Sequence, residues 1–209
     1  MPAGLHVSNH PFVRAKVTRL RDRSVSPKEF RELVSSLAEL LFVEATHDLA
    51  TEPITVETPL AVCPGVKISA QVGIIPILRA GLGMAEPLLH VLPDAIVWHL
   101  GLYRDHDTHQ PIWYYDKLPK QPNIDIAFIV DPMLATGGSV VAAVDRLKKW
   151  GVQRIKFLGL IAAPEGVAAL QSAHPDVSIY LAAVDTHLNE NRYIVPGLGD
   201  AGDRQFGTR

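Results

Sequence analysis

One short segment of the chain has the residue types and spacing that bind a phosphate group. An apolar run ends at Asp131, and the loop after it ends in Thr136, Gly137, Gly138 and Ser139, directly before a helical pattern. Glycines let consecutive backbone N–H groups converge on an anion, and the N-terminus of the next helix adds partial positive charge. The two hydroxyls can donate to the same anion. Asp131 would lie beside the phosphate, where its carboxylate can accept hydrogen bonds from sugar hydroxyls.

Two other kinds of loop share parts of this pattern. A plain strand-to-helix turn also favours a serine cap, but it does not need Thr-Gly-Gly-Ser behind a carboxylate. The phosphate loop of nucleotide-hydrolysing proteins requires G-x-x-x-x-G-K-[ST], which occurs nowhere in the chain. The segment therefore indicates binding of a phosphate monoester.

A positively charged group is predicted at the same edge of the protein. The sequence PILRAGLGM, residues 76–84, follows an apolar run, so its loop should leave the sheet beside the phosphate segment. Arg79 can present its guanidinium fork to a diphosphate, and Gly81 and Gly83 would allow close approach of the backbone. A solvated surface arginine is the alternative interpretation of Arg79.

The C-terminal tail contains a second glycine-rich segment. Residues 197–202 satisfy G-x-G-x-x-G, but they open no helix within a β-α-β unit and no acidic residue follows about 20 positions later, so dinucleotide binding is not indicated. Tyr193, Ile194, Val195 and Phe206 favour an ordered loop over a disordered tail. Backbone amides and carbonyls exposed by the glycines could hold the edges of a small planar ring.

Short apolar runs that alternate with helical patterns would position these segments. Strands are predicted at 72–77, 95–103, 124–130, 155–163 and 177–184, and helices at 84–92, 139–150 and 166–174. Several of the strands are apolar throughout, which requires that both faces of the sheet be covered. The alternation predicts an α/β fold with a central parallel sheet flanked by helices.

An amphipathic helix is predicted after Ser26, which can cap it, with Pro27 at its first position and Glu29 completing a capping box. Its apolar face would pack against the core or against a second subunit. A basic stretch precedes it and is interpreted as a solvated face interrupted by Asp22. The basic residues are Arg14, Lys16, Arg19, Arg21 and Arg23.

Residues 104–123 are polar and aromatic with three prolines, and they are interpreted as a protruding arm or lid. Four residues of this arm are a weak candidate for a metal site, because a mobile polar arm makes a poor cage. They are Asp105, His106, Asp107 and His109. Cys63 has no neighbouring basic group to activate it and is interpreted as structural.

Length and composition indicate an ordinary single domain spanning residues 1–209. The chain has 20 Lys and Arg against 22 Asp and Glu, a net charge of −2, which gives no general attraction for nucleic acid or an anionic membrane. A single cysteine, no signal-peptide pattern and no apolar stretch long enough to span a bilayer lead us to expect a cytoplasmic protein.

Three separated motifs resemble one protein family. The acid and the Thr-Gly-Gly-Ser loop resemble the phosphoribosyl-diphosphate motif of type I phosphoribosyltransferases. DPMLATGGS, PILRAGLGM and IVPGLGDAGDRQFGT together are similar to segments of uracil phosphoribosyltransferases, in a resemblance that runs from about Pro11 to the C-terminus. Pro132 departs from the wider superfamily, in which a second acid is usual at that position, but the single acid is typical of the uracil enzymes.

The resemblance implies a type I phosphoribosyltransferase fold with an arm at about 104–123 and a C-terminal hood at about 185–209. It also implies a pentosyltransferase that makes UMP and diphosphate from uracil and 5-phosphoribosyl 1-diphosphate (PRPP), with Mg²⁺ bound through PRPP and no dedicated metal site. The implied catalytic residues are Arg79, Asp131 and Asp200. The implied PRPP-binding residues are Arg79, Arg104, Asp131, Pro132, Met133, Leu134, Ala135, Thr136, Gly137, Gly138, Ser139 and Asp200. Uracil would contact Ile194, Gly199, Asp200 and Ala201.

Several alternatives remain open from the sequence. The proton of the uracil ring nitrogen could pass to Asp200 or to water. Alternatively, a backbone carbonyl could stabilise the developing base. A related enzyme could use another base, such as a purine or orotate, and a regulator that senses nucleotides and binds RNA would be supported only by the basic stretch. The resemblance further implies a homodimer or larger homo-oligomer, and some bacterial members of the family respond to GTP as an effector.

Overall fold

In the residues that the structure describes, 4–104 and 111–208 of a computed structural model, a nine-stranded sheet forms the centre of the protein. Its strands are β1 (Leu5–Val7), β4 (Val72–Leu78), β5 (Ile96–Val97), β6 (Leu100–Arg104), β7 (Pro111–Asp116), β8 (Ile126–Val130), β9 (Met133–Leu134), β10 (Arg154–Ala162) and β11 (Ser178–Val184). The order is β1-β11-β10-β8-β4-β6-β7, with β5 beside β4 and β9 beside β10. Of these described pairs, only β6 and β7 run antiparallel.

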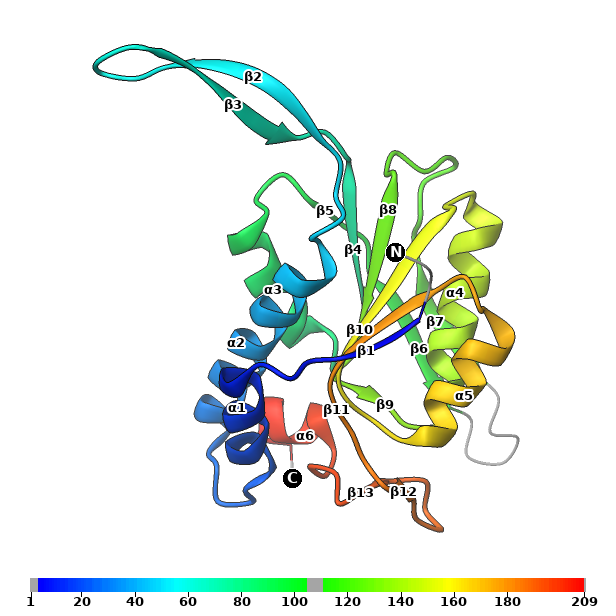
Figure 1. Cartoon of the computed structure of the whole chain (residues 1–209). Helices are drawn as coiled ribbons and strands as arrows, with labels where there is room; N and C mark the ends of the chain where they lie inside the picture. The colour runs from blue at the N-terminus through cyan, green and yellow to red at the C-terminus, as the bar shows by residue number, and fades with distance from the viewer. Residues whose placement is uncertain (1–3, 105–110, 209) are drawn as a thin grey trace.

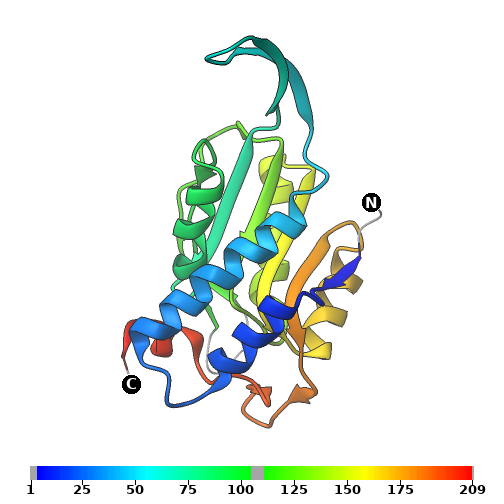
Figure 2. The same ribbon diagram turned by 60° about the vertical axis from the view of Figure 1, so that its left-hand side comes forward.

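Helices cover both faces of this sheet (Figure 1, Figure 2). One face carries α1 (Pro11–Arg21), α2 (Pro27–Ala45) and α3 (Leu82–Val91), and the other carries α4 (Gly138–Trp150) and α5 (Pro164–Ala173). Successive residues of β8 enter two separate apolar cores, since Phe128 packs with the first group of helices and Ile129 with the second. The unbroken apolarity of this strand therefore reflects burial on both faces, and the predicted fold class is confirmed.

The predicted strands agree with the structure in position. The runs at 72–77, 124–130, 155–163 and 177–184 form β4, β8, β10 and β11. The run at 95–103 is divided into β5 and β6, both of which pair with β4. None of the described helices is long and apolar enough to cross a membrane.

The tail lies across the end of the sheet where β4 and β8 finish (Figure 1). After β11 it forms two short antiparallel strands, β12 (His187–Leu188) and β13 (Ile194–Val195), and then helix α6 (Ala201–Phe206). Helix α6 packs against α2. The tail is therefore ordered, as its apolar residues predicted.

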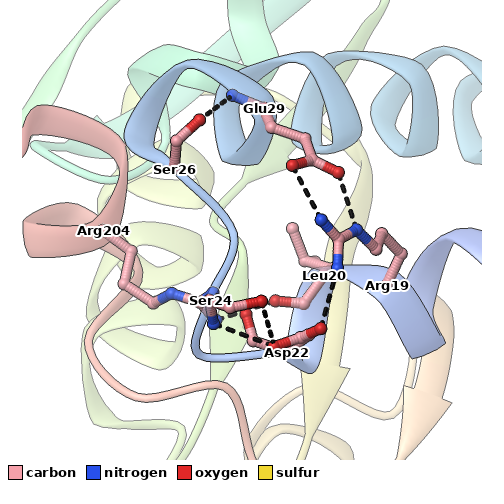
Figure 3. Close-up of polar contacts among 7 residues, drawn as sticks. All are labelled: Arg19, Leu20, Asp22, Ser24, Ser26, Glu29 and Arg204. Carbon is pink, nitrogen blue, oxygen red and sulfur yellow. Dashed lines mark hydrogen bonds and ion pairs between the residues drawn. The ribbon is translucent and has the colours of Figure 1, made fainter.

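The start of α2 differs in one respect from the predicted capping box. Ser26 Oγ accepts a hydrogen bond from Glu29 N at 3.3 Å, as expected of a cap. The Glu29 carboxylate, however, accepts from Arg19 Nε at 2.6 Å and from Arg19 Nη2 at 2.9 Å (Figure 3). The guanidinium is a stronger partner than a backbone amide, so Glu29 ties α2 to α1.

Part of the arm expected at 104–123 belongs to the central sheet. Residues 111–116 of the expected arm form β7 and pair with β6 at the sheet edge, because aromatic residues such as Trp113 favour a strand. The four metal-ligand candidates between residues 105 and 109 lie outside the described residues. A hairpin of β2 (Thr51–Glu57) and β3 (Val62–Ile68), which the sequence did not predict, projects from the body and contains Cys63 (Figure 1, Figure 2).

Candidate active site

The residues predicted to bind substrate follow the carboxyl ends of neighbouring strands. Arg79 follows β4, Asp131 follows β8, and Arg104 is the last residue of β6. Strand β4 is parallel to both β6 and β8, so all three positions lie at one edge of the sheet. This is the edge at which open α/β sheets bind their ligands.

The predicted phosphate loop encloses a small cavity. It has a volume of about 80 Å³ and is lined by Asp131, Met133, Leu134, Ala135, Thr136, Gly137, Gly138, Ser139 and Val140. Helix α4 starts at Gly138, so its N-terminal N–H groups face the loop. Pro132 is buried outside this lining, and its carbonyl accepts from Leu160 N and Ile161 N, which fixes the loop to β10.

Glycine is required where the loop meets helix α5. Gly137 has a φ of +82°, and a Cβ on it would lie 2.9 Å from Gly166 O. A Cβ on Gly166 would lie 2.4 Å from Ala135 O. The two glycines therefore let the start of α5 support the loop from behind.

The Asp131 carboxyl group lines the cavity of the phosphate loop. Its Oδ1 accepts from Met133 N at 3.1 Å. Burial raises the pKa of Asp131 to about 7, the Met133 N–H opposes that change, and the negative charge of Asp200 adds to it.

Arg79 extends toward the tail. Its side chain is 61% exposed, and Nη2 lies 3.7 Å from Asp203 Oδ1 in α6. The glycines beside it have a different role from the one expected. A Cβ on Gly81 would lie 2.4 Å from Val130 O, and one on Gly83 would lie 1.8 Å from Gln205 Oε1, so these glycines let the loop pack against β8 and α6.

The four predicted base-binding residues divide into two kinds. Ile194 is 4% exposed and Ala201 is 2% exposed, and both side chains belong to the apolar core. Gly199 and Asp200 are exposed, and Gly199 has a φ of +80°. Asp200 also caps α6, because its Oδ1 accepts from Asp203 N at 2.8 Å. Any contact from Ile194 or Ala201 to a base would thus come from the backbone.

Sequence reasoning missed the side chains that hold the tail in place. Arg204 donates to Leu20 O at 2.7 Å, in the last turn of α1, and to Asp22 O at 2.6 Å, directly after that helix (Figure 3). Arg21 pairs with Asp185, so the interpretation of the whole basic stretch as a solvated face was wrong for Arg21. One available signal was the position of Asp185, directly after a predicted strand.

Comparisons with known proteins agree with this arrangement. Residues 7–208 match the family described as UPRTase, uracil phosphoribosyltransferase. A protein named uracil phosphoribosyltransferase from Roseiflexus castenholzii is 60% identical over 202 residues, covering 97% of each chain. The solved structure of the AQ2163 protein from Aquifex aeolicus has a TM-score of 0.91 and 35% identity, covering 97% of this chain and 98% of that one.

A more distant structure has the same fold. The purine phosphoribosyltransferase from Pyrococcus horikoshii Ot3 has a TM-score of 0.50 and 18% identity, and the match covers 90% of each chain. The central sheet and its two layers of helices thus form the type I phosphoribosyltransferase fold. From the match over nearly its whole length, the chain belongs to the uracil phosphoribosyltransferase family.

Proposed function

We propose that this protein transfers the 5-phosphoribosyl group of PRPP to uracil, giving UMP and diphosphate. The observation that carries the proposal is the contact of Arg79 with the tail helix α6, where its Nη2 lies 3.7 Å from Asp203 Oδ1. Arg79 follows β4, which is parallel to β8, so this contact supports a single site formed by the phosphate loop and the glycine-rich tail. Membership of the uracil phosphoribosyltransferase family supports the same reaction.

The phosphate loop would hold the 5-phosphate of the donor. Backbone N–H groups at the start of α4 and the hydroxyls of Thr136 and Ser139 supply donors around the cavity. Asp131 lies beside it, where its carboxylate can accept hydrogen bonds from ribose hydroxyls. These contacts fix the sugar in one orientation, which lowers the entropic part of the barrier.

The diphosphate would leave toward the arginines. Arg79 is exposed at the end of β4 and can present its guanidinium to the departing oxygens. Arg104 ends β6 at the same edge of the sheet, so it is our second candidate for binding the diphosphate. As the bond from the anomeric carbon to oxygen breaks, negative charge grows on the diphosphate, and fixed positive groups stabilise it.

Uracil would lie against the tail, with its edges on the backbone near Gly199, Asp200 and Ala201. Its carbonyl groups accept hydrogen bonds and its imide donates one, so backbone amides and carbonyls can match both kinds of group. The ring nitrogen then attacks the anomeric carbon from the face opposite the diphosphate. Asp200 is our candidate for receiving the proton of that nitrogen, through its carboxylate at the start of α6.

Mg²⁺ would enter with the donor. The described residues contain no group of three His, Cys, Asp or Glu side chains that could hold a metal ion by themselves. Mg²⁺ is commonly bound by substrate phosphates, water and one or two carboxylates, and the acids facing this site fit that mode. When bound, the ion would supply positive charge to the diphosphate.

We further propose that the enzyme is a homodimer or larger homo-oligomer. Apolar side chains are exposed along the projecting hairpin, and such side chains are usually covered by a partner. The most exposed are Leu60, Val62, Val66 and Ile68. Sedimentation of the purified chain would show a monomer if this proposal is wrong.

The test of the reaction is chromatographic detection of UMP after the purified protein is mixed with uracil, PRPP and Mg²⁺. Adenine, hypoxanthine and orotate serve as parallel substrates. UMP as the main product supports the proposal. Product from another base alone would retain the phosphate site and overturn the role of the tail.

Ion pairs weaken the regulator hypothesis, which depends on the basic stretch at residues 14–23. Arg19 is paired with Glu29 and Asp22, and Arg21 with Asp185, so two of the basic residues are neutralised. A chain that forms no product yet binds RNA with a steep salt dependence would restore that hypothesis.

A further inference from the structure

Two charged side chains outside the substrate-binding segments form a buried ion pair beside the tail. Arg21 ends α1, and Asp185 directly follows β11. Asp185 accepts from both terminal nitrogens of Arg21, with Nη1 to Oδ2 at 2.8 Å. The side chain of Asp185 is 3% exposed and that of Arg21 is 23% exposed. Removing either partner would leave the other charge buried without compensation.

The same two side chains hold the backbone of Gly197. Asp185 Oδ2 accepts from Gly197 N at 2.8 Å, and Arg21 Nη1 donates to Gly197 O at 2.8 Å. Both polar backbone groups of this residue are therefore bonded to side chains from other elements. Gly197 has a φ of +64°, and a Cβ on it would lie 2.0 Å from Ile194 O, so the turn has little freedom to shift.

Residues on each side of Gly197 are also anchored. Thr186 N and Oγ1 donate to Val195 O, and Arg204 Nη1 donates to Leu198 O at 2.9 Å. The Arg204 guanidinium lies 4.4 Å from the centre of the Phe30 ring and reaches the turn between α1 and α2 (Figure 3). Gly199 and Asp200, which follow directly, remain exposed. The exposed residues Gly199 and Asp200 thus follow directly on a stretch of backbone that hydrogen bonds hold in place.

We propose that Arg21 and Asp185 are positioning residues for uracil. They act by fixing the backbone that leads into residues 199–201, where uracil would bind. The inference rests on the proposed function, since it concerns the base of that reaction. The donor is held by other elements, namely the loop at 131–139 and Arg79. Loss of the pair should therefore raise the KM for uracil far more than the KM for PRPP.

Steady-state kinetics on a small set of variants test this separation. Arg21→Met removes the charge and all three hydrogen bonds of the guanidinium while keeping an unbranched side chain. We expect about a tenfold or larger rise in the KM for uracil and a change within about threefold in the KM for PRPP. Arg21→Lys keeps the charge but not the fork, so its KM for uracil should lie between wild type and Arg21→Met. Arg14→Met, an exposed change on the same helix, is the matched control and should behave as wild type.

Equal rises in both KM values, in proportion to lost thermal stability, would overturn the inference, because that is what general destabilisation produces. An unchanged KM for uracil in folded Arg21→Met would also overturn it. If Arg21→Met does not fold, Arg21→Lys and Asp185→Asn decide the question with the same ratio of KM values.

Hydrogen exchange distinguishes failure of this inference from failure of the proposed function. In Arg21→Met without substrates, the peptide spanning 194–202 should exchange about tenfold faster than in wild type, with no change in Arg14→Met. Faster exchange with an unaltered KM ratio in an active enzyme would overturn the positioning role alone. A wild-type chain that forms no UMP would overturn the proposed function, and the inference with it.

Discussion

The two regions that meet at the site are held in place in different ways. The phosphate loop, residues 131–139, lies between β8 and α4, which adjoin it in the chain. The tail loop, residues 195–201, depends on Arg21 from α1 and on the turn after it, both remote in sequence. One contiguous segment therefore supplies the lining of the phosphate site, with support from β10 and α5. The tail loop is instead held by side chains that are remote from it in sequence.

This difference has consequences for chemistry. A phosphate presents the same oxygens to any converging set of donors, and a helix N-terminus with glycines supplies them locally. A planar base is recognised by a particular arrangement of donors and acceptors, so its site tolerates little displacement. The tail meets that need by bonding the backbone of Gly197 and Leu198 to arginine and aspartate side chains.

The largest effect is expected at Arg79, which lies between the two regions. Arg79→Ala should lower kcat about 100-fold or more, because its charge matters chiefly when negative charge develops on the diphosphate. The fold should survive, since the side chain is mostly exposed. Single-turnover kinetics and circular dichroism measure the two effects. Unchanged turnover would remove Arg79 from the site, and Arg14→Ala is the control for loss of a surface charge.

Asp131→Asn should have the next largest effect on activity, with kcat reduced about tenfold to 100-fold through lost contacts with the ribose hydroxyls. The measurement is kcat alongside thermal melting at several pH values. Loss of stability with normal activity per folded molecule would contradict the assignment of Asp131 to substrate.

The same substitution should stabilise the folded protein at alkaline pH. The pKa of Asp131 is about 7 in the folded state against an ordinary value of 3.8, so between these values the folded state holds more protons than the unfolded state. The free energy of unfolding contributed by this group therefore falls as pH rises from about 4 to 7. Asparagine carries no charge at any of these pH values and so does not lose stability in this way. The melting temperature of Asp131→Asn should therefore rise relative to that of wild type as the pH increases from 5 to 8. A constant difference across that range would show that the carboxyl is not buried as described.

Gly137→Ala should affect the phosphate loop and leave the tail unchanged. Its φ of +82° and the close approach of Gly166 O make an added methyl group unfavourable by about 1–3 kcal/mol. We expect the KM for PRPP to rise about tenfold, with the KM for uracil within about threefold of wild type. A larger change for uracil would break the separation of the two regions. Arg21→Met should instead raise the KM for uracil and leave the KM for PRPP nearly unchanged, so the two variants together test the separation in both directions.

The smallest effect is expected at the cap of α2. Ser26→Ala removes the bond to Glu29 N and should cost about 1 kcal/mol of stability, measured by denaturant unfolding. Activity per folded molecule should not change, because Arg19 still ties the start of α2 to α1. A change in the KM for uracil would mean that this helix end also positions the tail.

The contrast between the regions also explains what the sequence could predict. Periodicity and apolar runs gave β4, β8, β10 and β11, and the local pattern around Thr136 and Ser139 gave a loop that the structure forms around a cavity. The roles of Arg21 and Asp185 could not be predicted, because their pairing depends on how α1 packs beside β11. The hairpin at residues 51–68 was missed because its strands carry exposed, mixed residues with no buried face.

The most direct test of the two-region account is hydrogen exchange with two ligands that differ only in the base. Ribose 5-phosphate alone should slow exchange in peptides covering 131–140 and leave 194–202 as in the free protein, whereas UMP should slow exchange in both. UMP that protects 131–140 but not 194–202 would contradict the assignment of the tail to uracil. Protection of neither segment by UMP would contradict the site as a whole.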